Sequence, residues 1–378
     1  MLTSATRARD FPTLEGMTYL NTAAESIPPR CVGEALAAYW EHKQRGMRGR
    51  DEHYATWKAC QEVSARLLGR QLDEVSFCSC TSEAYNLLAS ALQLTPSDEV
   101  VITDLDFPAG VTTWLRAAAA PRVQLWRARG GELSIADLVP LLNAKTRLVQ
   151  VSLVSFLNGH RVVWPALRDA VRQLAPRAIL SVDITQAFGR IELDCGDADI
   201  VISSTHKWTL GVHGGCIVGV PAGRATELTT HAGGWHHLEN AFAADRFERA
   251  VPKSGAASFA VGMPSFAALY ALNASLRYLE QIGIAAIARH ADPLVAAVHR
   301  GLSELGITPM APAQPGYTSG IVAFQHPRAP ALHAALEQGN IHVMHQAGRI
   351  RVSLHGYNTS ADVERLLATL GRALTQSA

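Results

Sequence analysis

The amino-acid sequence predicts an α/β protein with a large domain built on a mostly parallel β-sheet of seven strands. Short apolar runs that suit buried strands alternate with amphipathic, helix-like segments between residues 75 and 220. Alternation of this kind is typical of parallel sheets covered by helices on both faces. A chain of 378 residues, 48% hydrophobic and 18% charged, can bury the core that such a fold needs.

The expected elements follow in order along the chain. Helices over residues 32–43 and 55–68 come first. Helices over 83–92 and 164–174 lie within the alternating region, and residues from about 224 to 258 are expected to be irregular. The expected strands are residues 75–78, 99–102, 123–126, 148–154, 178–182, 200–202 and 216–220.

The C-terminal part predicts a smaller α/β domain. A long linking helix over about 265–281 comes first. Strands at 319–324 and 349–353 and helices at 329–337 and 361–370 follow it. We therefore expect an N-terminal segment (1–18), a large domain (19–258) and a small C-terminal domain (259–378).

Composition and charge exclude several classes of function. The formal net charge is +1 without a run of five Lys or Arg residues, so we expect no nucleic-acid partner. No stretch of ~20 apolar residues predicts a membrane span, and Met1 to Arg7 lack the apolar core of a secretory signal. The six cysteines follow no repeating spacing, and Cys78 and Cys80 stand too close for the usual zinc pair. We therefore expect a cytoplasmic protein without a disulfide framework or a metal site.

Lys207 is the expected catalytic residue. It follows a buried strand and stands beside His206 and the hydroxyl residues Ser203, Ser204 and Thr205. Partial burial lowers the pKa of a lysine and leaves its amine free to form a Schiff base with an aldehyde. The alternative interpretation is an ordinary surface lysine in a loop.

Asp183 and Gln186 suit the same chemistry. A carboxylate at the end of the neighbouring strand can hold a proton on a pyridine nitrogen, and Gln186 could reach a phenolic oxygen of the same ring. Together with Lys207 they favour pyridoxal 5′-phosphate (PLP) as the cofactor. Asp183 could otherwise cap a turn.

Other polar residues also follow expected strands and so belong to the same edge of the sheet, where ligands bind. Thr81 and Ser82 open a helix, where free N–H groups and the helix dipole favour a phosphate, although an ordinary helix cap is the alternative. Phe107 could stack on a planar ring or belong to the core. Glycine-rich nucleotide loops do not occur, which disfavours a dinucleotide.

Arg349 and Arg351 share one face of the expected strand 349–353. A planar guanidinium can bind a carboxylate through two parallel hydrogen bonds, which is the contact that an amino-acid substrate needs. A solvated arginine on an edge strand is the alternative.

With these residues the chain resembles the class V aminotransferases, fold-type I PLP enzymes that include cysteine desulfurases, isopenicillin N epimerase-like proteins and kynureninase. The resemblance extends from Tyr19 to the last helix, and it is most specific at Asp183 and Gln186, at Ser204 to Lys207, and at Arg351 to Thr359. It implies the fold-type I architecture and a homodimer in which the partner chain completes each active site.

The resemblance also implies roles for individual residues. Phosphate contacts are expected from Ser82, Ser204 and His206, and ring stacking from Phe107. The substrate carboxylate is expected on Arg351. The rest of the substrate pocket is expected from the segment at Asn21, from Arg48 to His53, and from the loop with Trp235.

Two departures from the family pattern matter. No cysteine occurs after Cys216, so persulfide-forming desulfurase activity is disfavoured. Where the family often has Gly-Thr-Pro, whose threonine reaches the phosphate of the other subunit, this chain has Gly262-Met263-Pro264. We therefore expect Ser265 or a backbone N–H to replace the threonine, or the contact to be lost.

These residues predict chemistry at Cα of an amino acid and leave its outcome open. Transamination is the first choice because it needs no second acid or nucleophile. A lyase acting on a β-substituted amino acid and an epimerase are the alternatives, with His236, His237 or His345 as a candidate extra acid. A non-catalytic protein of this fold is disfavoured because Lys207, Asp183 and Arg351 are all present.

Overall fold

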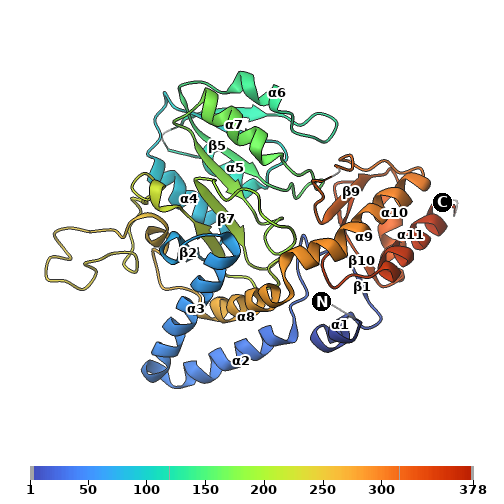
Figure 1. The fold of residues 1–378 in the computed structure, drawn as a ribbon, viewed down its shortest axis with the longest axis horizontal. Helices are drawn as coiled ribbons and strands as arrows, with labels where there is room; N and C mark the ends of the chain where they lie inside the picture. Colours follow the sequence, from blue (N-terminus) through green and yellow to red (C-terminus); the bar gives the residue numbers. More distant parts are fainter. Residues whose placement is uncertain (1–3, 119, 315, 376–378) are drawn as a thin grey trace.

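A computed structural model of the chain describes residues 4–118, 120–314 and 316–375 (Figure 1). The first three residues of the predicted N-terminal segment and the last three of the predicted C-terminal domain lie outside the described residues. None of the helices in the described part is both long and apolar enough to cross a membrane.

A seven-stranded sheet forms the centre of the molecule, in the order β2-β8-β7-β6-β5-β3-β4. The β8 strand runs antiparallel to β2 and β7, and the other neighbours pair in parallel. The predicted mostly parallel sheet is therefore confirmed. Its strands are β2 (Val75–Cys78), β3 (Glu99–Thr103), β4 (Arg122–Trp126), β5 (Thr146–Ser152), β6 (Ile179–Asp183), β7 (Ile200–Ser204) and β8 (Cys216–Gly219).

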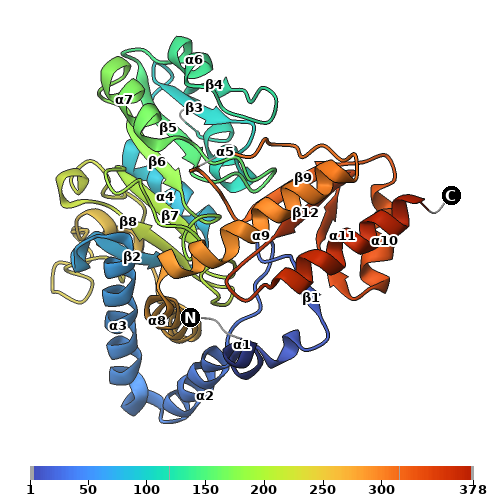
Figure 2. The ribbon, with the colours of Figure 1, turned by 45° about the vertical axis from the view of Figure 1, so that its right-hand side comes forward.

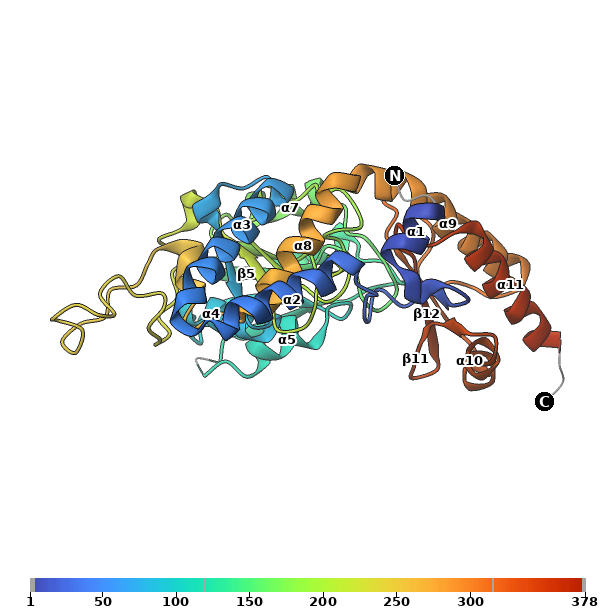
Figure 3. The ribbon, with the colours of Figure 1, turned by 90° about the horizontal axis from the view of Figure 1, so that it is seen from below.

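Helices cover both faces of this sheet, because alternate residues of its buried strands point to opposite sides. In β7, Val201 belongs to one apolar core while Ile200 and Ile202 belong to the other. Figure 3 shows α3, α7 and α8 on one side of the sheet and α4 and α5 on the other. These helices are α3 (Arg50–Leu68), α4 (Thr81–Leu92), α5 (Pro108–Leu115), α7 (Trp164–Leu174) and α8 (Phe266–Ile282); the short α6 is Ile135–Leu138.

A smaller antiparallel sheet, in the order β11-β12-β9, belongs to the C-terminal part. Its strands are β9 (Ile321–Gln325), β11 (Met344–Gln346) and β12 (Arg349–Ser353). The helices α9 (Ile284–Glu304), α10 (Ala329–Gln338) and α11 (Ser360–Thr375) contribute to its apolar core. The sequence analysis did not predict α9, which holds Pro293 in its interior, a residue that usually ends a helix.

Segments from the two ends of the chain cross between these parts. The strand β1 (Thr18–Tyr19) pairs with β10 (Ile341–His342), so the start of the chain contributes to the C-terminal part. The predicted linking helix, α8, packs along α2 (Arg30–Gln44) and α3. Figure 2 shows α9 continuing from α8 towards the small sheet. The contacts of α8 therefore lie with the region predicted as the large domain, and the division into domains stays a prediction.

The segment predicted to be irregular forms a projecting loop, seen in yellow at the left of Figure 1. No helix or strand occurs between residues 225 and 254, all of which are described, so the prediction is confirmed there; the end of the predicted segment belongs to a 3-10 helix, η6 (Gly255–Phe259). Two aromatic side chains of the loop, Phe242 and Phe247, are 83% and 87% exposed. Near the N-terminus, residues Ser4–Asp10 form a short helix, α1, which the sequence analysis did not predict.

A buried arginine joins the two parts. Arg190 follows β6, is fully buried, and donates hydrogen bonds to the carbonyl oxygen of Leu354 (2.9 Å) and to Oδ1 of Asp292 (2.8 Å) on α9. Burial lowers the pKa of its guanidinium. A buried charge without its partner costs several kcal/mol, so Asp292 stabilises the junction.

The variant Asp292→Ala is expected to lower the free energy of unfolding by ~2 kcal/mol, because Arg190 would lose the carboxylate that compensates its burial. Denaturant unfolding measures the change. The matched control is Asp169→Ala, which removes a largely exposed carboxylate from α7 and is expected to leave stability nearly unchanged. Equal effects of the two variants would contradict a stabilising role of the pair that Asp292, 37% exposed, forms with the buried Arg190.

Candidate active site

A cavity lies at the carboxyl ends of the parallel strands and contains Lys207. Of the residues that the sequence predicted for the cofactor, Ser82 and Ser265 do not line this cavity. The residues that line it are Thr81, Phe107, Ser152, Phe156, Asp183, Thr185, Gln186, Ser204, His206 and Lys207. The fold thus brings six of the eight predicted cofactor residues to the predicted lysine.

The Lys207 amine lies in this cavity, with Nζ 5.2 Å from the centre of the Phe107 ring. Burial lowers its pKa to about 8, the charge of Arg351 acts in the same direction, and Asp183 opposes the change. About a tenth of the amine is therefore neutral at pH 7, far more than of an ordinary lysine, and the neutral form is the one that attacks an aldehyde. The neighbouring His206 is almost wholly neutral at that pH, since burial lowers its pKa to about 4.

Asp183 ends β6 with its carboxylate held on both oxygens. The hydroxyl of Tyr85 donates to Oδ2 (2.9 Å) and the N–H of Thr185 donates to Oδ1 (2.8 Å). The Tyr85 hydroxyl in turn accepts a bond from the Gln150 side chain (3.2 Å). This network, which the sequence analysis did not identify, fixes the carboxylate where it faces the cavity.

A second buried acid, Asp106, follows β3. Its Oδ1 accepts the N–H of Ser152 (2.6 Å), and its Oδ2 is buried without a partner among the described residues. Burial raises its pKa to about 7, and the charge of Asp183 adds to the effect. Two acids near each other, of which Asp183 lines the cavity, favour a cationic group bound beside Asp183. A protonated pyridine nitrogen is such a group.

The part of the cavity at Thr81 and Ser204 offers hydrogen-bond donors. The first N–H groups of α4 have no acceptor within the helix, and the cap residue Cys80 makes no side-chain cap. Glu83 turns back to Ser79, whose N–H and hydroxyl both lie 2.6 Å from its carboxylate. The Ser204 hydroxyl is buried without a partner in the described part of the chain. Such a set suits a phosphate.

Gln186 is fixed between two neighbours. Its Oε1 accepts the indole N–H of Trp208 (2.6 Å) and its Nε2 donates to the carbonyl oxygen of Ala23 (3.0 Å). Because an indole N–H can only donate, the orientation of the amide follows from this contact. One amide hydrogen of Gln186 remains to donate into the cavity.

Arg351 is buried beside the cavity with 3% of its surface exposed. Its Nη1 donates to the carbonyl oxygen of Phe156 (2.7 Å), and the Phe156 ring packs edge-on against Phe107 at 5.0 Å. Burial, with a further contribution from Arg349, lowers the pKa of Arg351 to about 9. No carboxylate of the described residues forms an ion pair with it, so its charge is available to a substrate.

Three predicted residues lie away from the cavity or at its margin. Ser265 lines a separate pocket with Gly214 and Met263, and Trp235 belongs to the projecting loop, where it packs on Phe242. Asn21 forms a bridge with Ser353, two residues beyond Arg351, and its Oδ1 is buried without a partner among the described residues. A contribution of Ser265 or Trp235 from a second copy of the chain stays a prediction.

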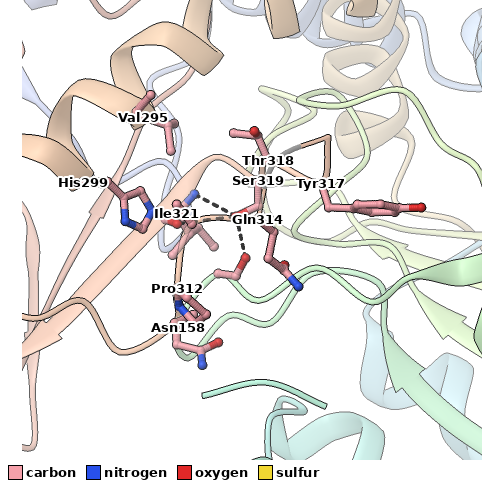
Figure 4. A pocket seen from close by; sticks show the side chains of 13 residues that line it. Asn158, Val295, His299, Pro312, Gln314, Tyr317, Thr318, Ser319 and Ile321 are labelled. Atoms are coloured by element: carbon pink, nitrogen blue, oxygen red, sulfur yellow. Dashed lines mark hydrogen bonds between the residues drawn. The ribbon is translucent and has the colours of Figure 1, made fainter. Parts of the chain in front are cut away.

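Figure 4 shows a different pocket, which shares none of its lining residues with the cavity of Lys207. Its lining includes Asn158 and Gly159 of that segment, His299 of α9, and Ser319. The Ser319 hydroxyl donates to the carbonyl oxygen of Gly159 (2.7 Å). The segment that holds the Arg351 side chain is therefore tied to the C-terminal part of the molecule.

Labelling of Lys207 by an aldehyde and a reducing agent is expected to rise with a midpoint near pH 8, because its folded-state pKa lies at about 8 rather than 10.5. The unfolded chain keeps this proton up to higher pH, so denatured protein is expected to label with a later midpoint. Peptide mapping by mass spectrometry measures both profiles in cofactor-free protein. Coincident folded and denatured profiles would contradict the burial of the amine.

Comparisons with known proteins identify the family. Residues 18–366 match the family model described as aminotransferase class-V. An uncharacterized aminotransferase of Bacillus subtilis, YcbU, is 28% identical over 360 residues, which cover 94% of each chain. A probable cysteine desulfurase of Pseudomonas putida is 28% identical over 399 residues, covering 97% of each chain.

Solved structures share the fold. The apo structure of a cysteine desulfurase from Thermococcus onnurineus has a TM-score of 0.86 at 23% identity and covers 98% of each chain. The cystine C-S lyase C-DES, in complex with cysteine persulfide, has a TM-score of 0.87 at 19% identity and covers 96% of this chain and 99% of that one. The chain therefore belongs to the class V aminotransferase family, with the fold-type I architecture and pyridoxal 5′-phosphate as its cofactor.

Proposed function

We propose that the protein is a PLP-dependent aminotransferase that acts at Cα of an amino acid through Lys207. The observation that carries the proposal is a partly buried lysine of lowered pKa that shares one cavity with Asp183. Beside this cavity Arg351 is buried without an acidic partner among the described residues. These three groups suit a nucleophilic amine, a partner for a pyridine nitrogen and a binding site for a carboxylate.

The residues of the cavity fit the cofactor from end to end. Asp183 would face the ring nitrogen, the Phe107 ring would stack on the pyridine, and Gln186 would donate to the phenolic oxygen. The first turn of α4 and the Ser204 hydroxyl would bind the phosphate. When bound, the cofactor supplies an electron sink that makes the Cα proton of an amino acid acidic.

The residues of the chain then determine which proton moves. Arg351 orients the substrate through its carboxylate, and the neutral Lys207 amine can remove the Cα proton and return it elsewhere. Transamination needs no further acid or nucleophile than these groups. The relative YcbU also bears the name of an aminotransferase.

A lyase is the second candidate. Several relatives are named cysteine desulfurases, and C-DES is named a cystine C-S lyase, so loss of a β-substituent is the main alternative outcome. An epimerase is the third. Persulfide formation on the enzyme is disfavoured: the last cysteine in sequence, Cys216, is fully buried and burial raises its thiol pKa well above the usual range.

We also propose a homodimer and a cytoplasmic location, without nucleic-acid or membrane partners. The projecting loop, with Phe242 and Phe247 exposed, and Met263, which is 47% exposed, form apolar surface that a second copy could cover. The partner copy would bring Ser265 and Trp235 towards the cavity. The net charge of +1 gives no electrostatic reason for a polyanionic partner.

Incubation of the PLP-loaded protein with a panel of amino acids, with and without an added keto acid, tests the reaction. Transamination is expected to give a keto acid and a new amino acid in equal amounts, scored by mass spectrometry together with inverted and eliminated products. Lys207→Ala is expected to lower turnover by more than ~100-fold, since the proton transfers lose their base. Eliminated fragments or inverted substrate as the main product would move the assignment to the lyase or the epimerase.

Asp183→Asn is expected to bind PLP more weakly and to lose nearly all turnover, because a neutral amide cannot stabilise the protonated pyridine nitrogen. Equilibrium dialysis measures cofactor binding independently of activity. Asp104→Asn is the matched control, since Asp104 directly follows a strand of the same sheet, β3, but is exposed. Near-normal turnover of Asp183→Asn would refute the assignment of this acid.

A further inference from the structure

The strand β12 presents two arginines to the large sheet. Ile350 and Val352 point into the apolar core formed with α9, α10 and α11. Because side chains alternate along a strand, Arg349 and Arg351 point to the opposite face. Both are almost completely buried, with 4% and 3% of their surface exposed.

Neither guanidinium has an acidic partner among the described residues. Arg351 donates to the carbonyl oxygen of Phe156, and Arg349 contacts Oε1 of Gln346 (3.4 Å) and the sulfur of Met344 (3.9 Å). The Nε of each arginine is buried without any partner in the described chain. Buried charges are costly unless they are paired, so two uncompensated guanidinium groups on one face call for negative charge from another molecule.

Aromatic rings connect this face to the reactive lysine. The Lys207 amine lies 5.2 Å from the Phe107 ring, and Phe107 packs against Phe156 at 5.0 Å. The guanidinium of Arg349 lies over the same Phe156 ring at 5.7 Å. Residues two apart on a strand are separated by ~6.6 Å, so two anionic groups a few bonds apart can reach both arginines.

The acids whose charges act at the cavity, Asp183, Asp106 and Glu25, have other partners. Asp183 is bonded to Tyr85 and Thr185, and Asp106 accepts from Ser152. Glu25 lies 3.1 Å from His213. None of these carboxylates forms an ion pair with Arg349 or Arg351 within the described ranges. The missing negative charge is therefore expected from the substrate.

Resting on the function proposed above, we propose that the substrate is an amino acid whose side chain ends in a carboxylate. Arg351 binds the α-carboxylate of the substrate, and Arg349 binds the carboxylate of its side chain. A planar guanidinium matches a carboxylate through two hydrogen bonds, and Phe156 forms the apolar wall beside both. Arg349 thereby determines the specificity of the site.

Titration of the PLP-loaded protein tests this assignment through the absorbance of the bound cofactor. L-Aspartate and L-glutamate are compared with L-asparagine and L-glutamine, which have nearly the same shape without the second charge, and with L-alanine. The acidic substrates are expected to bind on the order of 30-fold more tightly than their amides, since an amide leaves the buried Arg349 charge unpaired.

The variant Arg349→Gln is expected to abolish the preference for glutamate over glutamine, and Arg349→Lys to restore it in part. Arg300→Gln, which removes an exposed arginine from α9, is the matched control and is expected to keep the full preference. Circular dichroism checks that each variant is folded. Should Arg349→Gln fail to fold, the comparison of acids with amides on the natural protein decides the proposal.

Distinct outcomes separate this inference from the proposed function. Spectral changes with all five amino acids at similar affinity would overturn the acidic substrate and leave the PLP enzyme standing, and the charge opposite Arg349 would then come from a second copy of the chain. A preference that survives in Arg349→Gln would overturn the role of Arg349. A protein that binds PLP but responds to no amino acid would refute the proposed function itself.

Discussion

The parallel pairing of β6 with β7 is the constraint on which the site depends. This pairing sets Asp183, the last residue of β6, beside Ile202 of β7. The turn that follows β7 carries Lys207 and starts at the same edge of the sheet. A hydrogen bond from the hydroxyl of Thr209 to the carbonyl oxygen of Thr205 (2.8 Å) stabilises that turn. The strand register and this turn therefore bring the two ionisable groups, which are 24 residues apart in the sequence, into one cavity.

Charge is divided around this cavity in a way that follows from burial. Asp183 lines the cavity and Asp106 lies near it, and Tyr85 and backbone N–H groups are their partners. Arg351 and Arg349 adjoin the cavity through Phe156, and neither forms an ion pair with an acid of the described residues. Asp183 raises and Arg351 lowers the pKa of Lys207, so both charges act on the amine. Each of the two charged groups matches a charge of opposite sign on a molecule that the site would bind.

Much of this arrangement could be predicted from the sequence, since it depends on local patterns. Buried strands are apolar runs, and residues directly after parallel strands reach one edge, which placed Lys207, Asp183 and Ser204 together. The helix at Trp164–Leu174 and the strand at Arg349–Ser353 were predicted with the bounds that the structure has.

The parts that could not be predicted depend on tertiary contacts. Tyr85 has the pattern of an ordinary helix residue, and its bond to Asp183 forms only because α4 packs against the sheet at β7. Asp106, before Phe107 and Pro108, has the pattern of an exposed turn, yet it is buried. Phe156 lies in a segment without periodicity. No local pattern reveals that Arg349 lacks an acid, because an absent partner is a property of the whole fold.

The orientation of the Arg351 side chain depends on the contacts between the large sheet and the C-terminal part of the molecule. Ser155 is bonded to the carbonyl oxygen of Leu105 (2.9 Å) and Gly159 to Ser319, so the segment between them is anchored on both sides. Within that segment, the carbonyl oxygen of Phe156 accepts a hydrogen bond from Nη1 of Arg351. This bond leaves the other edge of the guanidinium, which includes the unpartnered Nε, for a carboxylate. The backbone of Phe156 therefore orients Arg351 before any substrate arrives, and less entropy is lost when a carboxylate binds.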